Sequence, residues 1–443
     1  MLNARKTNGL MGILHNNTTH MSEPMDALSW QKKIYLDGMA GILPKVPVDF
    51  AKLQKAAKNK MSKEAWAYIA GGAGRETTMA ENLSGFEKWK IVPRMLNDVS
   101  TRDTSTTLFG QKLPLPLLLS PVGVLEMVHK KADLAVGKAA AKAGIPFIFS
   151  NQASVPMETV ARAMGDSPRW FQLYWSKSNE LVESLVKRAE NCGVSAIVVT
   201  LDTSMLGWRT RDLDLAFLPF LKARGIAQYT SDPVFMRLLK EKAIGEETPV
   251  DRKIRPTTFL SLIQLLNNYP GSFFKNAFSG EPLAAVRQFI NIYSRPSLTW
   301  QDLAFLRKRT KLPILLKGIL HPEDAKMAME HEMDGIILSN HGGRQVDGAV
   351  STIEMLPEVK KAVGENFPIL LDSGVRSGAD MMKAVALGAS AVCMARSYAF
   401  GLAIDGEEGV YDVIRNMAAD FELNMGLAGC KNIEEVKALT LRE

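Results

Sequence analysis

The chain has 443 residues, with 54 Lys and Arg against 47 Asp and Glu, a net charge of +7, and 46% hydrophobic residues. This length predicts one large domain or two ordinary ones, with a substantial buried core. The composition excludes wholesale disorder and collagen-like or coiled-coil repeats.

The excess of positive charge is spread thinly along the chain. Its densest clusters are lysine pairs such as Lys32-Lys33, Lys130-Lys131 and Lys360-Lys361. A basic chain can bind nucleic acid, an anionic membrane surface or a small anion, or it can simply carry solvated surface charge. No nucleic-acid partner is expected, because no motif and no strip of interleaved basic and aromatic residues is found.

The number and spacing of the cysteines limit which disulfides, metal sites and cellular compartment are expected. Cys192, Cys393 and Cys430 lack C-x-x-C spacing, and an odd number leaves one of them unpaired. We therefore expect no disulfide framework and no metal site, and a cytoplasmic location fits. No window reaches about 18 consecutive apolar residues, so we expect no membrane-spanning helix and little membrane contact.

The N-terminal region precedes the regular pattern. Residues 1–44 are predicted to form a flexible tail, because Asn and Thr dominate the first 22 residues and the apolar run there is short. From residue 45 to 443 we expect a single barrel domain, which begins with a helical extension. That extension contains a predicted helix at 48–59 and a glycine-rich turn at 71–74.

Short apolar runs recur from residue 115 onward, each followed by a helical stretch. They lack polar alternation, as expected of parallel strands that are buried on both faces. Eight such runs alternating with helices predict a TIM (β/α)8 barrel, with a doubly wound sheet as the second choice. The runs are 115–120, 145–150, 170–174, 196–201, 314–317, 335–339, 369–372 and 391–394, and the predicted helices are 131–143, 178–191, 322–331, 352–363 and 377–387.

One connection is much longer than the others. The stretch from Asp202 to Pro313, after the fourth strand, predicts an insertion at about residues 210–300. Insertions of this size are usually functional or mobile. Its amphipathic segment 258–278 could cover a site, join protomers or touch a membrane.

Polar residues follow the predicted strands. In a (β/α)8 barrel the carboxyl ends of the strands share one rim, so these side chains should converge there. They are Ser120 to Gly123, Ser150, Gln172, Tyr174, Thr200, Asp202, Lys317, Ser339 to Arg344, Asp372 to Arg376, and Arg396.

Three strand-end clusters could carry chemistry. His341 and Arg344 flank two glycines, so a natural base and a carboxylate fork could point inward from one tight loop; the alternative is a capping loop with a structural histidine. Asp202 could orient a histidine, or could be an ordinary helix cap. Arg376 and Arg396 follow strands seven and eight, where such barrels bind phosphate, although a surface salt bridge is the alternative.

Lys317 ends the fifth strand and is expected to be buried. A buried cation requires a nearby anion, and an electron-rich cofactor ring would suit it. Nucleophile elbows, P-loops and G-x-G-x-x-G sequences are absent from the sequence.

These residues resemble the FMN-dependent 2-hydroxy-acid oxidase and dehydrogenase family from about residue 45 to 430. The resemblance is carried by S-N-H-G-G-R-Q-V-D-G, L-D-S-G-V-R-S-G-A-D, F-Q-L-Y, L-K-G and A-x-G-G-A-G-x-E-x-T. Within the family the chain is most similar to the lactate 2-monooxygenases, in residues 71–74 and 207–212, in the long insertion, and in Gly123, where many oxidases have Ala. Ala395-Arg396-Ser397 departs from the usual Gly-Arg-Pro of the family.

The resemblance implies a role for each matching position. His341 would take the hydroxyl proton while hydride passes to flavin N5, and Asp202 would pair with the imidazolium. Arg209 and Arg344 would bind the substrate carboxylate, and Tyr68 and Tyr174 would also contact its carboxylate and hydroxyl groups. Lys317 would face N1 and O2 of the flavin. The positions implied to bind FMN are Pro121, Val122, Gly123, Ser150, Gln172, Thr200, Lys317, Ser339, Asp372, Gly374, Arg376, Ala395 and Arg396.

The resemblance also implies an activity. We expect FMN-dependent oxidation of an L-2-hydroxy acid, with L-lactate first among substrates, O2 as acceptor, and decarboxylation to acetate, CO2 and water. Alternatives are an L-lactate oxidase that releases pyruvate and H2O2, a quinone-linked L-lactate dehydrogenase, and a non-catalytic binding barrel. The resemblance implies a homo-oligomer, either a tetramer or an octamer.

Overall fold

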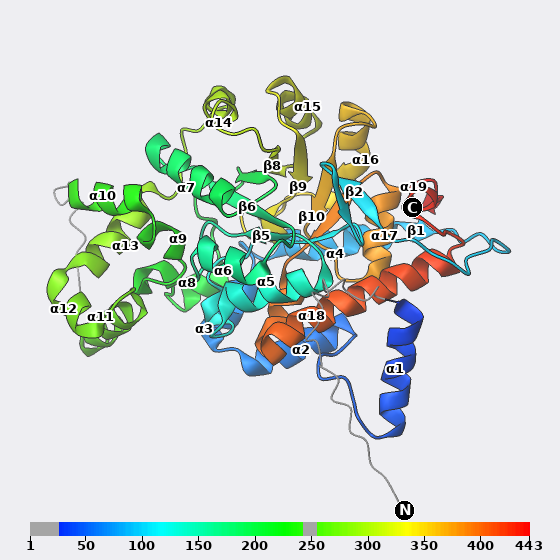
Figure 1. Ribbon diagram of the computed structural model, residues 1–443, viewed down its shortest axis with the longest axis horizontal. Coiled ribbons are helices and arrows are strands. Elements are labelled where there is room, and N and C mark those ends of the chain that lie inside the picture. The colour runs from blue at the N-terminus through cyan, green and yellow to red at the C-terminus, as the bar shows by residue number, and fades with distance from the viewer. Residues whose placement is uncertain (1–25, 242–254) are drawn as a thin grey trace, which may run out of the picture.

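The computed structural model describes residues 26–241 and 255–443. Its centre is a closed barrel of parallel strands in the order β10-β11-β4-β5-β6-β7-β8-β9 (Figure 1). All eight predicted strands are confirmed, as β4 (Leu117–Leu119), β5 (Phe147–Phe149), β6 (Arg169–Tyr174), β7 (Ile197–Thr200), β8 (Ile314–Ile319), β9 (Gly335–Leu338), β10 (Ile369–Asp372) and β11 (Ala391–Met394). The doubly wound alternative is therefore wrong.

The strands are continuous apolar runs because both of their faces are buried. One set of side chains, including Leu118, Ile148 and Val198, fills the barrel interior. Their neighbours along the strands, such as Leu117 and Phe147, pack in the larger outer core with the helices. The hairpin of β2 (Thr106–Leu108) and β3 (Gln111–Leu113) adds two leucines to the interior cluster, and β1 (Lys90–Ile91) pairs with β12 (Leu441–Arg442).

A ring of helices surrounds the barrel. The five predicted helices are confirmed as α5 (Ala132–Ala143), α7 (Asn179–Asn191), α15 (Pro322–Glu330), α16 (Thr352–Val363) and α17 (Gly378–Ala386). Their ends follow local chemistry: Ser178 caps α7 by accepting a hydrogen bond from Leu181 N at 3.3 Å, and Gly144 ends α5 at a φ of +69°. The ring also contains α6 (Met157–Met164) and α18 (Arg396–Leu427), and α19 (Ile433–Lys437) follows.

Part of the region predicted as an N-terminal tail is helical. Ala27–Met39 forms α1, whose Trp30 indole donates to Asn416 Oδ1 at 2.9 Å and stacks with Arg415 of α18. The only buried residue of α1 is Ala27, so the helix leaves little apolar periodicity in the sequence. Residues 1–25 lie outside the described residues. The predicted helix at 48–59 is confirmed as α2 (Phe50–Lys60), which precedes α3 (Lys63–Ala70) and α4 (Thr77–Lys88).

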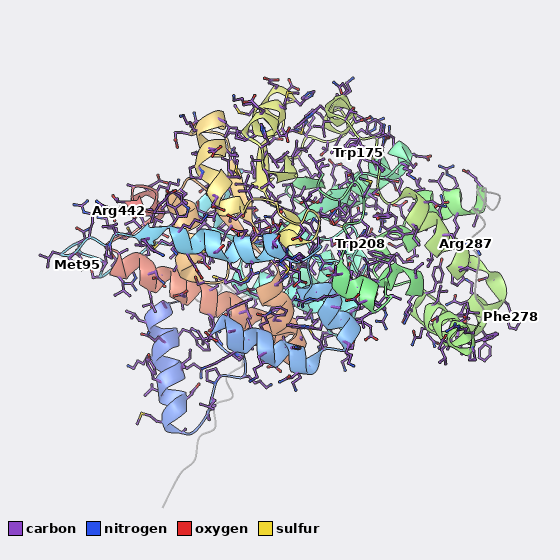
Figure 2. The ribbon with its side chains drawn as sticks, turned by 180° about the vertical axis from the view of Figure 1, so that it is seen from behind. Met95, Trp175, Trp208, Phe278, Arg287 and Arg442 are labelled. Carbon is purple, nitrogen blue, oxygen red and sulfur yellow. The ribbon has the colours of Figure 1, made fainter. Side chains whose placement is uncertain are left out.

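The insertion after β7 is a helical layer over one side of the barrel mouth (Figure 1). The predicted amphipathic segment 258–278 divides at Tyr269, and its exposed Phe278 lies at the outer end of this layer (Figure 2). Its helices are α8 (Thr210–Asp214), α9 (Ala227–Thr230), α10 (Pro233–Glu241), α11 (Pro256–Asn268), α12 (Phe273–Ser279) and α13 (Glu281–Ile292), and α14 (Leu303–Arg307) leads into β8. Short 3-10 turns occur at Leu125–Met127 (η1), Pro219–Lys222 (η2), Trp300–Asp302 (η3) and His341–Gly343 (η4).

Among residues 26–241 and 255–443, none of the helices combines the length and the apolarity needed to cross a bilayer.

Candidate active site

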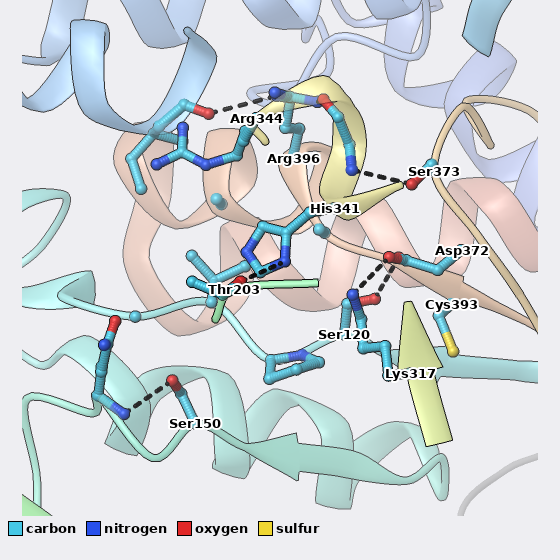
Figure 3. Close-up of a pocket in the computed structure, with 18 of the residues that line it drawn as sticks. Ser120, Ser150, Thr203, Lys317, His341, Arg344, Asp372, Ser373, Cys393 and Arg396 are labelled. Carbon is cyan, nitrogen blue, oxygen red and sulfur yellow. Dashed lines mark hydrogen bonds and ion pairs between the residues drawn. The ribbon is translucent and has the colours of Figure 1, made fainter. Parts of the chain in front are cut away.

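A cleft opens at the carboxyl ends of the barrel strands (Figure 3). The structure brings most of the predicted site residues to its walls. They are Tyr68, Pro121, Val122, Gly123, Ser150, Tyr174, Arg209, Lys317, His341, Arg344, Asp372, Gly374, Arg376, Ala395 and Arg396. Asp202, Gln172, Thr200 and Ser339 are not part of this wall. Thr200 and Asp202 instead line an adjoining cavity that also includes Tyr174.

His341 lies in the turn η4, directly after β9. Its φ of +58° and those of Gly342 and Gly343 are left-handed, and the loop can adopt this shape because two of the three residues are glycines. A Cβ on Gly343 would lie 2.7 Å from Met79 Cγ, so the loop packs closely against α4. The Ser373 hydroxyl accepts a hydrogen bond from Gly342 N at 2.9 Å. The turn is therefore fixed on two sides.

The carboxylate of Asp202 holds the imidazole of His341. His341 Nδ1 lies 2.8 Å from Asp202 Oδ1 and 3.2 Å from Thr203 Oγ1, which leaves Nε2 for the cleft. Burial lowers the pKa of His341, although Asp202 opposes that effect. Burial alone would raise the pKa of Asp202, but the charges of His341 and Lys317 outweigh it and the net shift is downward. A neutral imidazole beside a fixed carboxylate can act as a base.

A buried ion pair crosses the floor of the cleft. Lys317 Nζ lies 3.1 Å from Asp372 Oδ2 and donates to Ser339 Oγ at 2.9 Å (Figure 3). The hydroxyls of Ser339 and Ser120 each donate to Asp372 at 2.7 Å. The expected anion for Lys317 is thus present within the chain. Despite burial, the pKa of Lys317 is raised, chiefly by Asp372 and Asp202.

Two guanidinium groups face the cleft close to His341. Arg344 Nη1 donates to Gly71 O at 3.0 Å and to Tyr68 O, and Arg209 Nη2 donates to Gln345 Oε1 at 3.1 Å. Burial, and then the charge of Arg209, lowers the pKa of Arg344 to about 10. Within the described residues neither guanidinium forms a salt bridge with a carboxylate. This arrangement suits a small carboxylate ligand.

The two tyrosines stand beside these guanidinium groups. The Arg344 guanidinium lies 5.0 Å from the centre of the Tyr68 ring. Burial, and then the charge of Asp202, raises the pKa of Tyr174 to about 12, so its hydroxyl stays protonated at neutral pH. Both hydroxyls can donate hydrogen bonds to an oxygen of a ligand in the cleft.

The opposite end of the cleft carries two partly buried arginines. Burial lowers the pKa of Arg376 to about 10, and its Nε has no hydrogen-bond partner in the part of the chain that the structure describes. Arg396 donates to the carbonyl oxygens of Gly342 at 2.9 Å and Gly71 at 3.0 Å, and it begins the long helix α18. A Cβ on Gly374 would lie 2.2 Å from Asn82 O, so this loop requires glycine. Partly buried cations at a helix N-terminus suit a phosphate.

Two predicted residues lie behind the wall with unpaired polar atoms. Gln172 Nε2 and Thr200 Oγ1 are buried and have no hydrogen-bond partner among the described residues. Gln172 Oε1 accepts from Asn151 N at 3.0 Å, and Ser150 Oγ lies 3.4 Å from the same oxygen. The free amide and hydroxyl are on neighbouring strands, β6 and β7.

Several wall residues were not predicted from the sequence. Phe220 and Tyr293 come from the insertion and Leu206 from the segment just before it, where no motif marks them, and Gln152 follows β5.

Asp347 is a structural residue outside the cleft wall, and it lies in one of the motifs quoted above. Its carboxylate accepts hydrogen bonds from Arg75 N at 2.6 Å and Thr77 N at 2.8 Å. It thereby joins the loop after α3 to the loop after His341. A carboxylate three residues after an arginine was the only available signal.

Known proteins support the interpretation of this geometry. The FMN-dependent dehydrogenase family matches residues 57–443. The L-lactate oxidase of Lysinibacillus sphaericus (strain C3-41) is 42% identical over 395 residues, which are 89% of this chain and 92% of that protein. The glycolate oxidase of Spinacia oleracea is 36% identical over 385 residues, which are 86% and 91% of the two chains.

Solved structures agree. A crystal structure of mandelate oxidase with (S)-4-hydroxymandelic acid has a TM-score of 0.74 and 33% identity to this chain, and the match covers 89% of this chain and 99% of that one. Because the family match spans most of the sequence and includes the whole barrel, the chain belongs to the FMN-dependent dehydrogenase family and is an FMN-dependent 2-hydroxy-acid oxidoreductase.

Proposed function

We propose that the protein oxidises a small L-2-hydroxy acid, L-lactate first among them, and passes the electrons to O2. The observation that carries the proposal is the combination, in one cleft, of the Asp202-held imidazole of His341 with the guanidinium groups of Arg209 and Arg344, which form no salt bridge within the described residues. A 2-hydroxy acid needs a base for its hydroxyl group and cations for its carboxylate within a few ångströms of each other.

The donor set fits FMN. The buried Gln172 amide and Thr200 hydroxyl lack partners and suit the polar edge of a flavin, and Lys317 supplies positive charge for its reduced ring. Arg396, which begins α18, and Arg376, which follows β10, suit the phosphate. We assign FMN to these residues together with Pro121, Val122, Gly123, Ser150, Ser339, Asp372, Gly374 and Ala395. When bound, FMN supplies an acceptor for the hydride that leaves the substrate C2 carbon.

The residues of the chain divide the remaining work. Arg209 and Arg344 bind the carboxylate, and the Tyr68 and Tyr174 hydroxyls orient the substrate oxygens. His341 Nε2 takes the hydroxyl proton while the C2 hydrogen leaves with its electron pair, so the alcohol becomes a 2-oxo acid. Asp202 stabilises the resulting imidazolium at Nδ1.

The monooxygenase and oxidase alternatives differ in what happens to the product. Phe220 and Tyr293 of the insertion form part of the cleft wall, and they can retain the product. A retained pyruvate reacts with the peroxide formed from O2, so that lactate and O2 give acetate, CO2 and water. Early release gives pyruvate and H2O2 instead. The similarity to lactate 2-monooxygenases at Gly123 and residues 207–212 favours retention.

Product analysis under air tests this proposal. We expect the FMN-loaded enzyme to convert L-lactate to acetate and CO2, with one O2 consumed per lactate and no free peroxide. Pyruvate with equimolar H2O2 would select the oxidase. Dye or quinone turnover with negligible O2 consumption would select the dehydrogenase. A protein that takes up no FMN, or whose flavin is not bleached anaerobically by any 2-hydroxy acid, would contradict the catalytic assignment.

A further inference from the structure

The cleft wall contains a side-chain amide that no step above uses. Gln152 follows β5 and is only 7% exposed, yet it lines the cleft. Among the described residues, neither its Oε1 nor its Nε2 has a hydrogen-bond partner; the hydrogen bonds at this position come from its backbone. Both amide atoms reach the open space of the cleft, where they are available to a ligand.

The backbone at Gln152 is firmly held, so the side chain projects from a rigid loop. Gln152 N donates to Ser150 Oγ at 3.1 Å, and Gln152 O accepts from Val124 N at 3.0 Å. The next residue, Ala153, accepts from Ala227 N of the insertion at 3.2 Å. The unpaired amide is therefore not the result of a loosely placed segment.

The amide is adjacent to the reacting part of the cleft. A Cβ built on Gly123 would lie 3.2 Å from Gln152 Cβ and 3.6 Å from its Oε1, so the Gln152 side chain borders the space beside Gly123. Gly123 belongs to the backbone stretch assigned to FMN. Apolar or aromatic groups of Leu206, Phe220 and Tyr293 share the same cleft.

This placement determines which substrate side chain fits. A substrate held by Arg209, Arg344 and His341 uses its carboxylate and 2-hydroxyl on those groups, and only the group on C2 remains for other wall residues. The methyl group of lactate cannot satisfy an amide. A hydroxyl on C3 can both donate to Oε1 and accept from Nε2.

We propose that Gln152 is a specificity-determining residue that lets the cleft accept small 2-hydroxy acids bearing a neutral hydroxyl on C3, such as L-glycerate, alongside L-lactate. The inference rests on the proposed function and narrows its substrate class. A hydroxyl is favoured over a second carboxylate because Arg209 and Arg344 are both assigned to the first carboxylate.

The test compares two acids that differ by one oxygen. The full-length, FMN-loaded parent and the variants Gln152→Leu and Gln152→Met are mixed anaerobically with L-lactate or L-glycerate, and flavin bleaching gives the efficiency for each acid. We expect the parent to use glycerate with an efficiency comparable to that for lactate. Both substitutions should lower the glycerate efficiency about tenfold and change the lactate efficiency less than about threefold.

Matched controls separate polarity from shape. Phe220→Leu changes the volume of the same cleft without changing its polarity, and it should alter both acids by similar factors. A binding measurement accompanies the kinetics: hydroxypyruvate and pyruvate, titrated against the oxidised flavin spectrum, should show the same tenfold loss for hydroxypyruvate only. Flavin content and melting temperature verify that each variant is folded.

The outcomes are distinct. Equal factors for both acids in the Gln152 variants, or a parent that strongly prefers lactate, would overturn the role of Gln152 while leaving the oxidation of 2-hydroxy acids intact. Failure of both acids to bleach the parent flavin would overturn the proposed function and this inference with it.

Discussion

His341 Nδ1 and Asp202 Oδ1 lie 2.8 Å apart although 139 residues separate them in the chain. They meet because Asp202 follows β7 and His341 follows β9, and both strands end at the same rim of the barrel. The contact fixes the imidazole with Nε2 toward the cleft. It also opposes the lowering of the His341 pKa that burial produces.

The first prediction concerns this pair. Asp202→Asn should lower the rate of flavin reduction by about 10²–10⁴-fold, because the imidazole loses its orienting partner and its charged form loses a counter-ion. Asp202 raises the pKa of His341, so its removal lowers that pKa further. Activity rises with pH as the base is deprotonated, and this rise should therefore move to lower pH in rapid-mixing measurements of kcat/KM.

Two companions test the assignment. Thr203→Val removes a hydroxyl 3.2 Å from the same Nδ1 but keeps the carboxylate, and it should stay within about fivefold of the parent. His341→Gln should bind FMN but lose reduction. A His341→Gln variant that is reduced at the parent rate would show that another group is the base.

The second prediction concerns carboxylate binding. Arg209→Met should raise KM for the 2-hydroxy acid by about 10- to 100-fold, because a charge-assisted contact is lost, with a smaller change in kcat. Arg209 suits this test because its side chain donates to Gln345 Oε1 at 3.1 Å and to Arg344 O at 3.4 Å, whereas Arg344 bonds to the carbonyl oxygens of both Tyr68 and Gly71. Steady-state kinetics with a single 2-hydroxy acid measures the changes in KM and in kcat separately.

The control for Arg209 lies in the same segment. Arg211 pairs with Glu76 and does not line the cleft. Arg211→Met should leave KM within about twofold, since this partly exposed ion pair does not line the cleft and contributes little to binding there. An equal KM increase in both variants would mean that loop disorder, and not carboxylate binding, causes the effect.

The barrel could be predicted from the sequence because its strands are buried on both faces and so leave continuous apolar runs, such as 314–317. The rim could be predicted because polar residues such as Lys317 and Asp202 directly follow those runs. Helix α1 could not, since polar contacts with α18 hold it in place of an apolar face. Phe220 and Tyr293 could not either, because only the tertiary path of the insertion brings them to the cleft.

The third prediction concerns the buried ion pair. Asp372 is only 6% exposed, and Lys317→Met would leave its carboxylate buried without a cation. The variant should therefore lose about 3–5 kcal/mol of stability. The double variant Lys317→Met/Asp372→Asn should recover part of that loss, because no charge is then left unpaired. Denaturant unfolding of the parent, Lys317→Met, Asp372→Asn and the double variant gives the coupling energy. A double variant less stable than Lys317→Met would contradict the explanation.

The fourth prediction concerns a buried carboxyl outside the cleft. Asp133 is 2% exposed, its Oδ2 accepts from Ser154 N at 2.8 Å and Val155 N at 3.2 Å, and its Oδ1 has no partner. Burial raises its pKa to about 7. A group whose pKa is higher in the folded state contributes stability at low pH and loses that contribution as pH rises through the folded value. The parent should therefore lose stability between about pH 4 and 7.

Asp133→Asn keeps an acceptor for the two backbone amides but never becomes charged. At pH 8 it should melt a few degrees above the parent, and this advantage should vanish toward pH 4. Differential scanning calorimetry across the pH range checks both points. The exposed Asp98→Asn serves as the contrast: hydrogen bonds with Ser100 lower the pKa of Asp98, so this variant should gain no advantage over the parent as pH rises. An Asp133→Asn variant with the same melting temperature difference at every pH would show that Asp133 does not titrate in this range, and that its backbone hydrogen bonds alone stabilise the loop after β5.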